Sequence, residues 1–430
     1  MQENFELEKR EESKASFSKK RIGYLVLAFA AVIALSVLLT FFFTVRYFFL
    51  AEDSKYGKFE VLDQYIDRFS YYEPDHDQML DAALKAYVSG TGDRYAQYYN
   101  SEDFKALNED NEGRFVGIGV SITSADVIYL GESLSLIEIV AVYESSPAEE
   151  AGLLEGDIVY SVFTSDGEIF TDDVGLDVIS SKIKGEEGTA VKISVLRGDN
   201  GDYEKLEFTM TRRSVDINSV SYEVCESQPL VGIVRISRFD LRTPQLMKTA
   251  FNSLGAAGIS RIILDMRGNP GGDLNSVVAC ASYFLDTGDV IISTEDNRGN
   301  RTVERVRERA YAENYSSCDI SANEIGMFKA TELVVLVDRN TASAAELLTA
   351  VFRDYDLAVI VGEKTYGKGT MQTIYPLSYM GYGGGIKITT NVYFPPCGEN
   401  YDGVGITPHI TVDSSDDNAW LETAINQFEK

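Results

Sequence analysis

Histidine is scarce in this chain of 430 residues, which holds only His76 and His409. The four cysteines are scattered without a Cys-x-x-Cys pair, and no His-Glu-x-x-His motif occurs. These absences exclude a zinc site built from clustered histidine and cysteine. A Ser-His-Asp triad would need one of the two histidines as base, but His76 lies in a polar helical segment and His409 in a strand-like pattern. Any hydrolytic base is therefore expected to be another residue type.

Positive charge is also in short supply. The chain has 39 Lys and Arg against 67 Asp and Glu, a formal net charge of -28. Because no basic stripe is present to neutralise phosphates, nucleic acid is disfavoured as a partner. Apolar residues make up 44% and charged residues 25%, as in a folded globular chain, and the length suggests two to three domains.

One long uncharged run lies near the start of the chain. Residues 22–45 carry no charge, and as a helix they would span about 36 Å, more than a hydrocarbon core of about 30 Å. The basic cluster Lys19, Lys20 and Arg21 precedes the run. We predict a cytoplasmic segment at 1–21, a transmembrane helix at 22–45 and an extracytoplasmic remainder. The alternative is a cleavable signal peptide, but the following letters FFLAED match its cleavage site poorly.

The next two regions differ in pattern. Residues 46–112 show helical periodicity and predict a helical N-terminal region. Residues 113–212 change to short strands and glycine turns, and they contain GIGV at 117–120 and SSPAEEAGLLEGDIV at 145–159. With both motifs at this spacing, the segment resembles a PDZ domain of the bacterial type.

The PDZ resemblance implies a site for the free end of a peptide chain. Successive backbone N–H groups can bind a terminal carboxylate, and an exposed strand edge beside them can pair with the extended peptide. An apolar groove would hold the peptide's side chains. The residues that we assign to peptide binding are Val116, Gly117, Ile118, Gly119, Val120, Leu176 and Ile179.

Residues 213–430 alternate apolar strands with helices and predict an α/β domain whose helices cover a largely parallel sheet. Ser343 lies where a strand gives way to a helix, so its hydroxyl is beside the unpaired N–H groups of the first turn. Lys368 comes from a glycine-rich loop after the next strand. A buried lysine can be neutral and accept the serine proton, so this pair needs no histidine.

Three motifs in order carry a family resemblance: DMRGNPGGDL at 265–274, TASAAEL at 341–347 and GEKTYGKGTMQ at 362–372. They resemble the C-terminal processing peptidases, serine endopeptidases with an inserted PDZ domain. The resemblance implies a crotonase-like α/β peptidase domain. It also implies that Ser343 is the nucleophile, that Lys368 is the general base and that Gln372 orients the lysine. The implied oxyanion donors are the backbone N–H groups of Ala344 and Gly271.

Each of these residues has a plainer interpretation. Ser343 could serve only as a helix N-cap, Lys368 could be a solvated loop lysine, and the glycines could serve the turn alone. Asp265 looks like a turn-closing residue rather than an acid. The three matched motifs together favour the catalytic interpretation.

We therefore expect a membrane-anchored, extracytoplasmic serine endopeptidase that acts on proteins or peptides with apolar C-terminal ends and uses no cofactor or metal. Its alternative is a catalytically idle PDZ scaffold that tethers partners at the membrane. A hydrolase of small acyl substrates is a third reading of the same fold. A homodimer, cysteine pairing and the natural substrate are left open by the sequence.

Overall fold

The computed structural model of the chain describes residues 24, 26–43, 56–164, 167–199, 202–311, 313–412 and 417–429. The contacts divide the chain into two compact units, Met1–Ala83 and Leu84–Lys430. The predicted cytoplasmic segment at 1–21 falls outside the described residues.

The first unit contains the apolar helix Val26–Phe43, whose mean hydropathy is 2.7. Over the described residues, this is the one helix long and apolar enough to cross a membrane, and a signal sequence would have the same character. Helix α2 (Gly57–Phe69) follows, and α3 (His76–Ser89) begins in this unit. His76 pairs with two aspartates of α2 across 3.1 and 2.9 Å, as expected for a surface residue.

The region with the PDZ resemblance is built on an antiparallel sheet in the order β3-β4-β5-β7-β8, with β6 beside β5. Its strands are β3 (Val120–Tyr129), β4 (Glu132–Val142), β5 (Ile158–Thr164), β6 (Gly167–Phe170), β7 (Ala190–Asp199) and β8 (Asp202–Thr211). Its helices are α5 (Pro147–Ala151), α6 (Thr171–Val174) and α7 (Leu176–Ile183). Gly175, at φ 78°, separates α6 from α7.

A two-stranded ribbon joins this region to the rest of its unit. Strand β2 (Arg114–Gly117) enters the region and pairs antiparallel with β9 (Arg213–Asp216), which leaves it. Because the two connections pair with each other, the entry and exit of the inserted region lie side by side.

The peptidase-like region has a second sheet in the order β10-β11-β12-β15-β16-β19. The strands are β10 (Val220–Val224), β11 (Val231–Ile236), β12 (Arg261–Asp265), β15 (Glu332–Val337), β16 (Ala358–Gly362) and β19 (Ile410–Thr411). All neighbours after the β10-β11 hairpin are parallel, which confirms the predicted α/β class.

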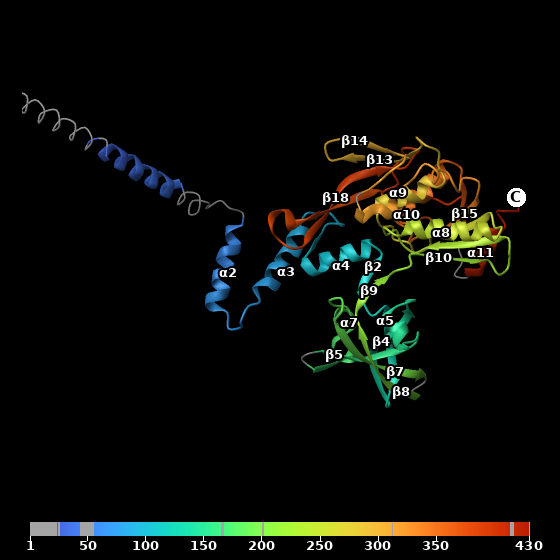
Figure 1. Cartoon of the computed structure of the whole chain (residues 1–430), viewed down its shortest axis with the longest axis horizontal. Helices are drawn as coiled ribbons and strands as arrows, with labels where there is room; N and C mark the ends of the chain where they lie inside the picture. Colours follow the sequence, from blue (N-terminus) through green and yellow to red (C-terminus); the bar gives the residue numbers. More distant parts are fainter. Residues whose placement is uncertain are drawn as a thin grey trace, which may run out of the picture. The chain divides into compact units, whose positions relative to one another are not determined.

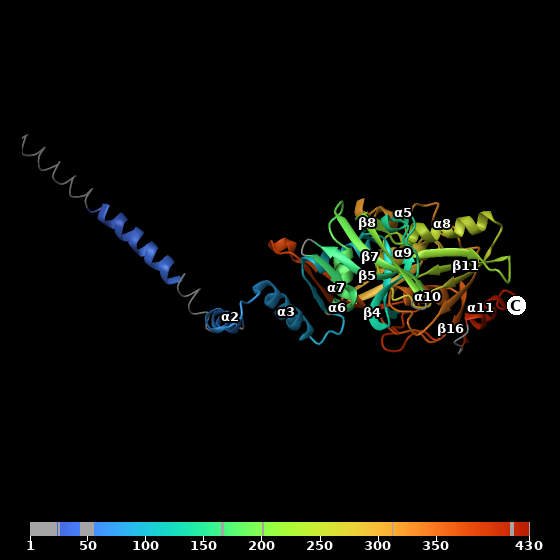
Figure 2. The same cartoon turned by 90° about the horizontal axis from the view of Figure 1, so that it is seen from below.

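Both faces of this sheet are covered. Helices α8 (Thr243–Ala256), α9 (Leu274–Ser282) and α10 (Ala344–Asp354) share one core with Ile262, Leu264 and Val335 (Figures 1 and 2). Helix α11 (Asp417–Ile425) packs with the alternate residues Ile263 and Val334 on the other face. Continuous apolar strands with alternate residues in two cores are typical of a buried parallel sheet.

An additional antiparallel sheet was not predicted. Its order is β1-β18-β13-β14, with β17 beside β18. The strands are β1 (Gln97–Tyr99), β13 (Val290–Asp296), β14 (Arg301–Arg305), β17 (Thr370–Pro376) and β18 (Gly385–Phe394). Strand β1 interrupts the region expected to be helical and is followed by α4 (Ser101–Asn111). Three residues become a strand there because β18 offers them an edge. Short 3-10 helices lie at Glu313–Cys318 and Leu377–Met380.

Candidate active site

The ends of three neighbouring strands meet at one cavity. Strands β12, β15 and β16 are adjacent and parallel, so the turns at their carboxyl ends lie at the same edge. A cavity of about 720 Å³ lies there. Its lining includes every catalytic and oxyanion residue expected from the sequence: Gly271, Ser343, Ala344, Lys368 and Gln372.

Ser343 occupies a strained turn between β15 and α10. Its φ of 56° and ψ of -118° lie in a region that residues other than glycine rarely adopt. The turn is held by hydrogen bonds from Ala342 N to Asn269 O at 2.9 Å and from Tyr366 N to Thr341 O at 3.0 Å. Such strain costs roughly 1–3 kcal/mol and persists where the surroundings over-determine it.

A buried carboxylate that the sequence prediction did not include connects the serine to the lysine loop. Glu346 is fully buried and accepts a hydrogen bond from Ser343 N at 2.9 Å. It also accepts from the backbone N–H groups of Gly367 at 2.7 Å and Lys368 at 2.8 Å, and from Thr365 Oγ1 at 2.6 Å. Four donors satisfy the buried charge, so one side chain sets the spacing of two loops.

The ammonium of Lys368 lies over the ring of Tyr95, 4.6 Å from its centroid. Burial lowers the pKa of Lys368, and the positive charges of Lys387 and Arg94 lower it further. The negative charges of Glu346 and Asp402 act in the opposite direction. A lowered pKa favours the neutral amine that can accept a proton.

The serine and lysine share the cavity but are not bonded to each other. Among the hydrogen bonds of the described residues, none joins Ser343 Oγ to Lys368 Nζ. Burial raises the pKa of the Tyr393 hydroxyl, which lines the same cavity, and the Ser343 side chain acts against this rise. The Gln372 amide donates to Thr370 Oγ1 at 3.2 Å and to Thr389 Oγ1 at 3.1 Å. The expected orienting role of Gln372 therefore stays a prediction.

Two backbone N–H groups near Ser343 are available to donate hydrogen bonds to a negatively charged oxygen. In the part of the chain that the structure describes, no acceptor takes the N–H of Ala344 or of Gly272. The N–H of Gly271, our predicted second donor, donates to Asn269 Oδ1 at 2.8 Å. Gly271 nevertheless approaches Ser343 closely, since a Cβ there would lie 2.7 Å from Ser343 Cβ. Ala344 and a residue of the glycine pair can thus flank an oxyanion.

The residues assigned to peptide binding divide into two groups. Ile118 and Ile179 are fully buried in the core of their region, whereas Val116, Val120 and Leu176 are half-buried. Strand β3 is an edge strand that packs beside α7. Gly119 has φ 85°, and a Cβ there would lie 2.2 Å from Ser146 Cβ. A Cβ at Gly117 would lie 3.9 Å from the Cγ of Lys184, so Gly117 is a neighbour of this side chain.

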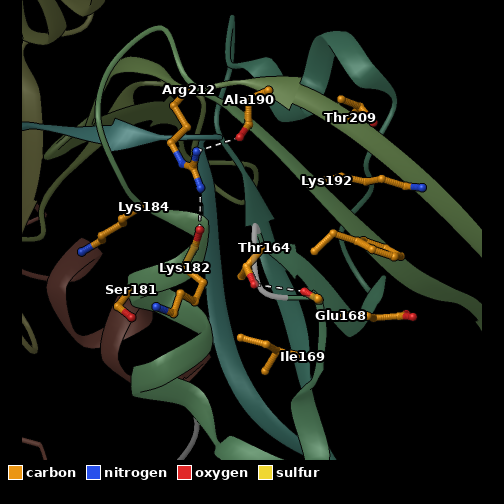
Figure 3. A pocket seen from close by; sticks show the side chains of 12 residues that line it. Thr164, Glu168, Ile169, Ser181, Lys182, Lys184, Ala190, Lys192, Thr209 and Arg212 are labelled. Carbon is orange, nitrogen blue, oxygen red and sulfur yellow. Dashed lines mark hydrogen bonds between the residues drawn. The ribbon is translucent and has the colours of Figure 1, made fainter.

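A second cavity, of about 550 Å³, lies on the other side of α7. Figure 3 shows Lys182 and Lys184 near α7 and Lys192 on the opposite wall. Lys192 is paired with Glu207 at 2.8 Å. Arg212 donates to the carbonyl groups of Lys182 and Ala190, so it closes the end of the helix rather than presenting a free cation.

Two residues considered in the sequence have structural roles. His409 Nδ1 accepts from Ile360 N at 2.9 Å, which joins two strands away from the cavity lining. Asp265 is bound by the Arg267 guanidinium at 2.8 and 2.9 Å and closes its turn. The described residues contain no cluster of His, Cys, Asp or Glu that could hold a metal ion.

Comparison with known proteins agrees with this arrangement. Residues 230–412 match the family model of peptidase family S41. The "Probable CtpA-like serine protease" of Staphylococcus aureus (strain COL) is 26% identical over 422 residues, covering 96% of this chain and 78% of the relative. The protein of the same name in Staphylococcus epidermidis (strain RP62A) is 28% identical over 410 residues, covering 93% and 76%.

Two solved structures are similar to the chain, and the first, with a TM-score above 0.5, resembles it in fold. An S41 protease from Bacteroides fragilis has a TM-score of 0.52 at 17% identity, covering 84% of this chain and 92% of its own. The photosystem II D1 C-terminal processing protease has a TM-score of 0.44 at 25% identity, covering 86% and 90%.

Proposed function

From the premise that this chain is a serine peptidase of family S41, we propose that it is an endopeptidase whose nucleophile is Ser343 and whose general base is Lys368. The observation that carries this proposal is the meeting of a strained serine and a half-buried lysine of lowered pKa in one cavity. Glu346 binds the backbone of both residues, so the two loops are held at a fixed spacing.

The reaction follows from these groups. Neutral Lys368 takes the proton of the Ser343 hydroxyl while Oγ attacks the scissile carbonyl. The N–H of Ala344 and one N–H of the glycine pair at 271–272 stabilise the oxyanion. The lysine then gives its proton to the leaving amine, and a water molecule activated by the same lysine hydrolyses the acyl-enzyme. Substrate binding has to bring the Ser343 hydroxyl into a hydrogen bond with Lys368 Nζ for this sequence to begin.

The region at 113–212 is proposed to bind the free C-terminal end of the substrate. Edge strand β3 offers unpaired backbone groups to an extended peptide. Gly119 lies too close to Ser146 to carry a side chain. At this glycine the loop can therefore offer its backbone N–H groups to a carboxylate. The half-buried Val120 and Leu176 are the groove residues, whereas the buried Ile118 and Ile179 support them from the core.

Attachment to a membrane is proposed for the helix Val26–Phe43. It is long and apolar enough to span a bilayer, and the basic residues before it favour an extracytoplasmic active site. Detection of the full chain in carbonate-washed membranes supports an anchor, whereas a shorter mature chain in the soluble fraction supports a cleaved signal sequence.

The test of the dyad compares wild type with Ser343→Ala and Lys368→Ala on an unfolded protein that ends in apolar residues. Both variants are expected to lose at least about 10³-fold in cleavage rate. Lys364→Ala, an exposed lysine of the same loop, is the matched control. Cleavage that survives both active-site substitutions would refute the dyad, and peptide binding without cleavage by any form would support an idle scaffold.

A further inference from the structure

Tyr393, on β18, is a residue of the catalytic cavity to which the Ser-Lys mechanism gives no role. It is 4% exposed and lines the same cavity as Ser343 and Lys368. Its place in the sequence gives no hint of this, because it lies 50 residues after the serine and 25 after the lysine.

The Tyr393 hydroxyl takes part in two hydrogen bonds. It donates to the backbone oxygen of Lys368 and accepts from the Tyr401 hydroxyl at 3.0 Å. A phenol has one proton and two lone pairs. Lys368 O takes the proton and Tyr401 uses one lone pair, so one lone pair is left for a further donor in the cavity that Tyr393 shares with Ser343.

The donor and acceptor roles in these hydrogen bonds do not change around neutral pH. Burial raises the pKa of both the Tyr393 and the Tyr401 hydroxyl. Both phenols therefore keep their protons, and the chain of bonds runs from Tyr401 through Tyr393 to Lys368 O.

The backbone of β18 is tied to the same loop. Tyr393 N donates to Gly369 O at 3.0 Å. The Asn400 amide donates to Gly369 O at 3.0 Å and to Tyr393 O at 2.5 Å. The phenol ring therefore has little freedom to move relative to Lys368.

We propose that Tyr393 is a positioning residue of the dyad: its hydroxyl holds the main chain of the base's loop at Lys368, in the cavity that also contains the nucleophile. The inference rests on the proposed Ser343–Lys368 mechanism. At the start of the reaction, the Ser343 O–H points at Lys368 Nζ. The amine takes the proton as the Oγ–carbon bond forms, and Tyr393 keeps its own proton and its bond to Lys368 O.

The decisive variant is Tyr393→Phe, which removes the hydroxyl and keeps the ring. We expect kcat on a fluorogenic peptide with a free apolar C-terminus to fall by about tenfold to hundredfold, with KM within about twofold. The rate at which a fluorophosphonate labels Ser343 should fall by a similar factor, because that reaction needs the serine and its base in position but does not need the peptide. Tyr401→Phe, which removes the more distant hydroxyl, is the matched control and should lose about threefold or less.

Thermal unfolding of both variants shows whether a lower rate comes from lost positioning or from lower stability of the whole protein. The comparison is matched because each variant loses one buried hydroxyl of the Tyr393–Tyr401 pair. The proposal is overturned if Tyr393→Phe labels and turns over within twofold of wild type, if it is faster than wild type, or if Tyr401→Phe loses as much. If Tyr393→Phe behaves as expected while Ser343→Ala and Lys368→Ala are inactive, both proposals stand. Activity in Ser343→Ala or Lys368→Ala would instead overturn the underlying dyad.

Discussion

The edge of the parallel sheet where we propose catalysis (the catalytic edge) and the face of the PDZ-like region where we propose peptide binding (the peptide-binding face) are built in different ways. At the catalytic edge, buried polar side chains join loops that are distant in sequence: Glu346 alone binds four donors from two loops. At the peptide-binding face, a backbone turn at Gly119 rests on an apolar core that includes Ile118 and Ile179.

This difference predicts different responses to substitution. A buried polar network loses several interactions when one member is removed, because every remaining donor loses its acceptor. A face made from backbone groups loses little when a single side chain changes, unless the change reshapes the backbone. Catalysis should thus be sensitive to single polar residues and peptide capture to single glycines.

The largest effect is expected for Glu346→Ala. Four buried donors, three of them backbone N–H groups, would lose their acceptor, so we expect unfolding free energy to fall by about 2–4 kcal/mol. The turnover number should fall by more than about hundredfold even at low temperature, because the two loops lose their common anchor. Urea unfolding and peptide hydrolysis measure the two effects.

Glu363→Ala is the matched control for this substitution. Glu363 pairs with Arg339, whose side chain is largely exposed, at 3.3 Å, so its removal should cost less than about 1 kcal/mol. If Glu346→Ala matched this control in stability and turnover, the polar network would not hold the catalytic edge.

The second effect compares glycines of the two regions. In Gly271→Ala, the new Cβ would meet Ser343 Cβ at 2.7 Å and Ala344 N at 2.8 Å, so turnover should fall by about hundredfold. In Gly119→Ala, the overlap is with Ser146, which is not among the residues that line the catalytic cavity. Peptide binding should weaken by at least about tenfold while turnover at saturation stays within about threefold.

Gly131→Ala separates overlap from backbone strain. Gly131 also has a positive φ, of 86°, but a Cβ there would meet no atom within 4 Å. It should cost only about 1 kcal/mol of stability. An equal loss of turnover in Gly271→Ala and Gly119→Ala would remove the distinction between the two regions.

The sequence could predict the features that rest on short local patterns. Apolar runs followed by turn residues predict where two strands end, one before the glycine turn at 268–272 and one before Ser343. The structure brings these turns and Lys368 to one cavity. The fully buried position of Ile118 could not be read from GIGV, because which face of a short strand is covered depends on the tertiary fold.

Other parts of the site depend on contacts that are remote in sequence. Strand β1 exists because β18 pairs with it, and it brings Tyr95 near Lys368 from 273 residues away. Tyr393 reaches the lysine loop from a distant strand in the same way. Glu346 did leave a local signal, since Ser343 and Glu346 have the spacing of a capping box. That motif explains the bond to Ser343 N but not the three bonds to the lysine loop.

A third, smaller effect concerns the free end of the peptide. Replacing the terminal carboxylate of a peptide by an amide should raise KM by about tenfold and leave kcat within about twofold, because the carboxylate is bound away from the reacting atoms. In Gly119→Ala the two peptides should have the same KM. A change confined to kcat would place the carboxylate in the catalytic cavity instead.

The smallest effect concerns the charge state of the base. Lys387 on β18 lines the catalytic cavity, bonds with Gln97 Oε1 at 3.3 Å, and lowers the pKa of Lys368. Protonated Lys368 cannot take the serine proton, so activity is lost as pH falls through its pKa. Lys387→Met removes a like charge and should move this acid limb of kcat/KM to higher pH by about half a unit to one unit.

Lys387→Arg keeps the positive charge, so the acid limb of kcat/KM should stay at the wild-type pH. This variant separates the effect of the charge from that of side-chain packing. The remaining charged groups that act on Lys368 are unchanged in both variants: Arg94, Glu346 and Asp402. At pH values well above the limb, Lys387→Met and wild type should turn over at similar rates. A uniform loss at all pH values would mean that Lys387 contacts the substrate rather than tuning the pKa of Lys368.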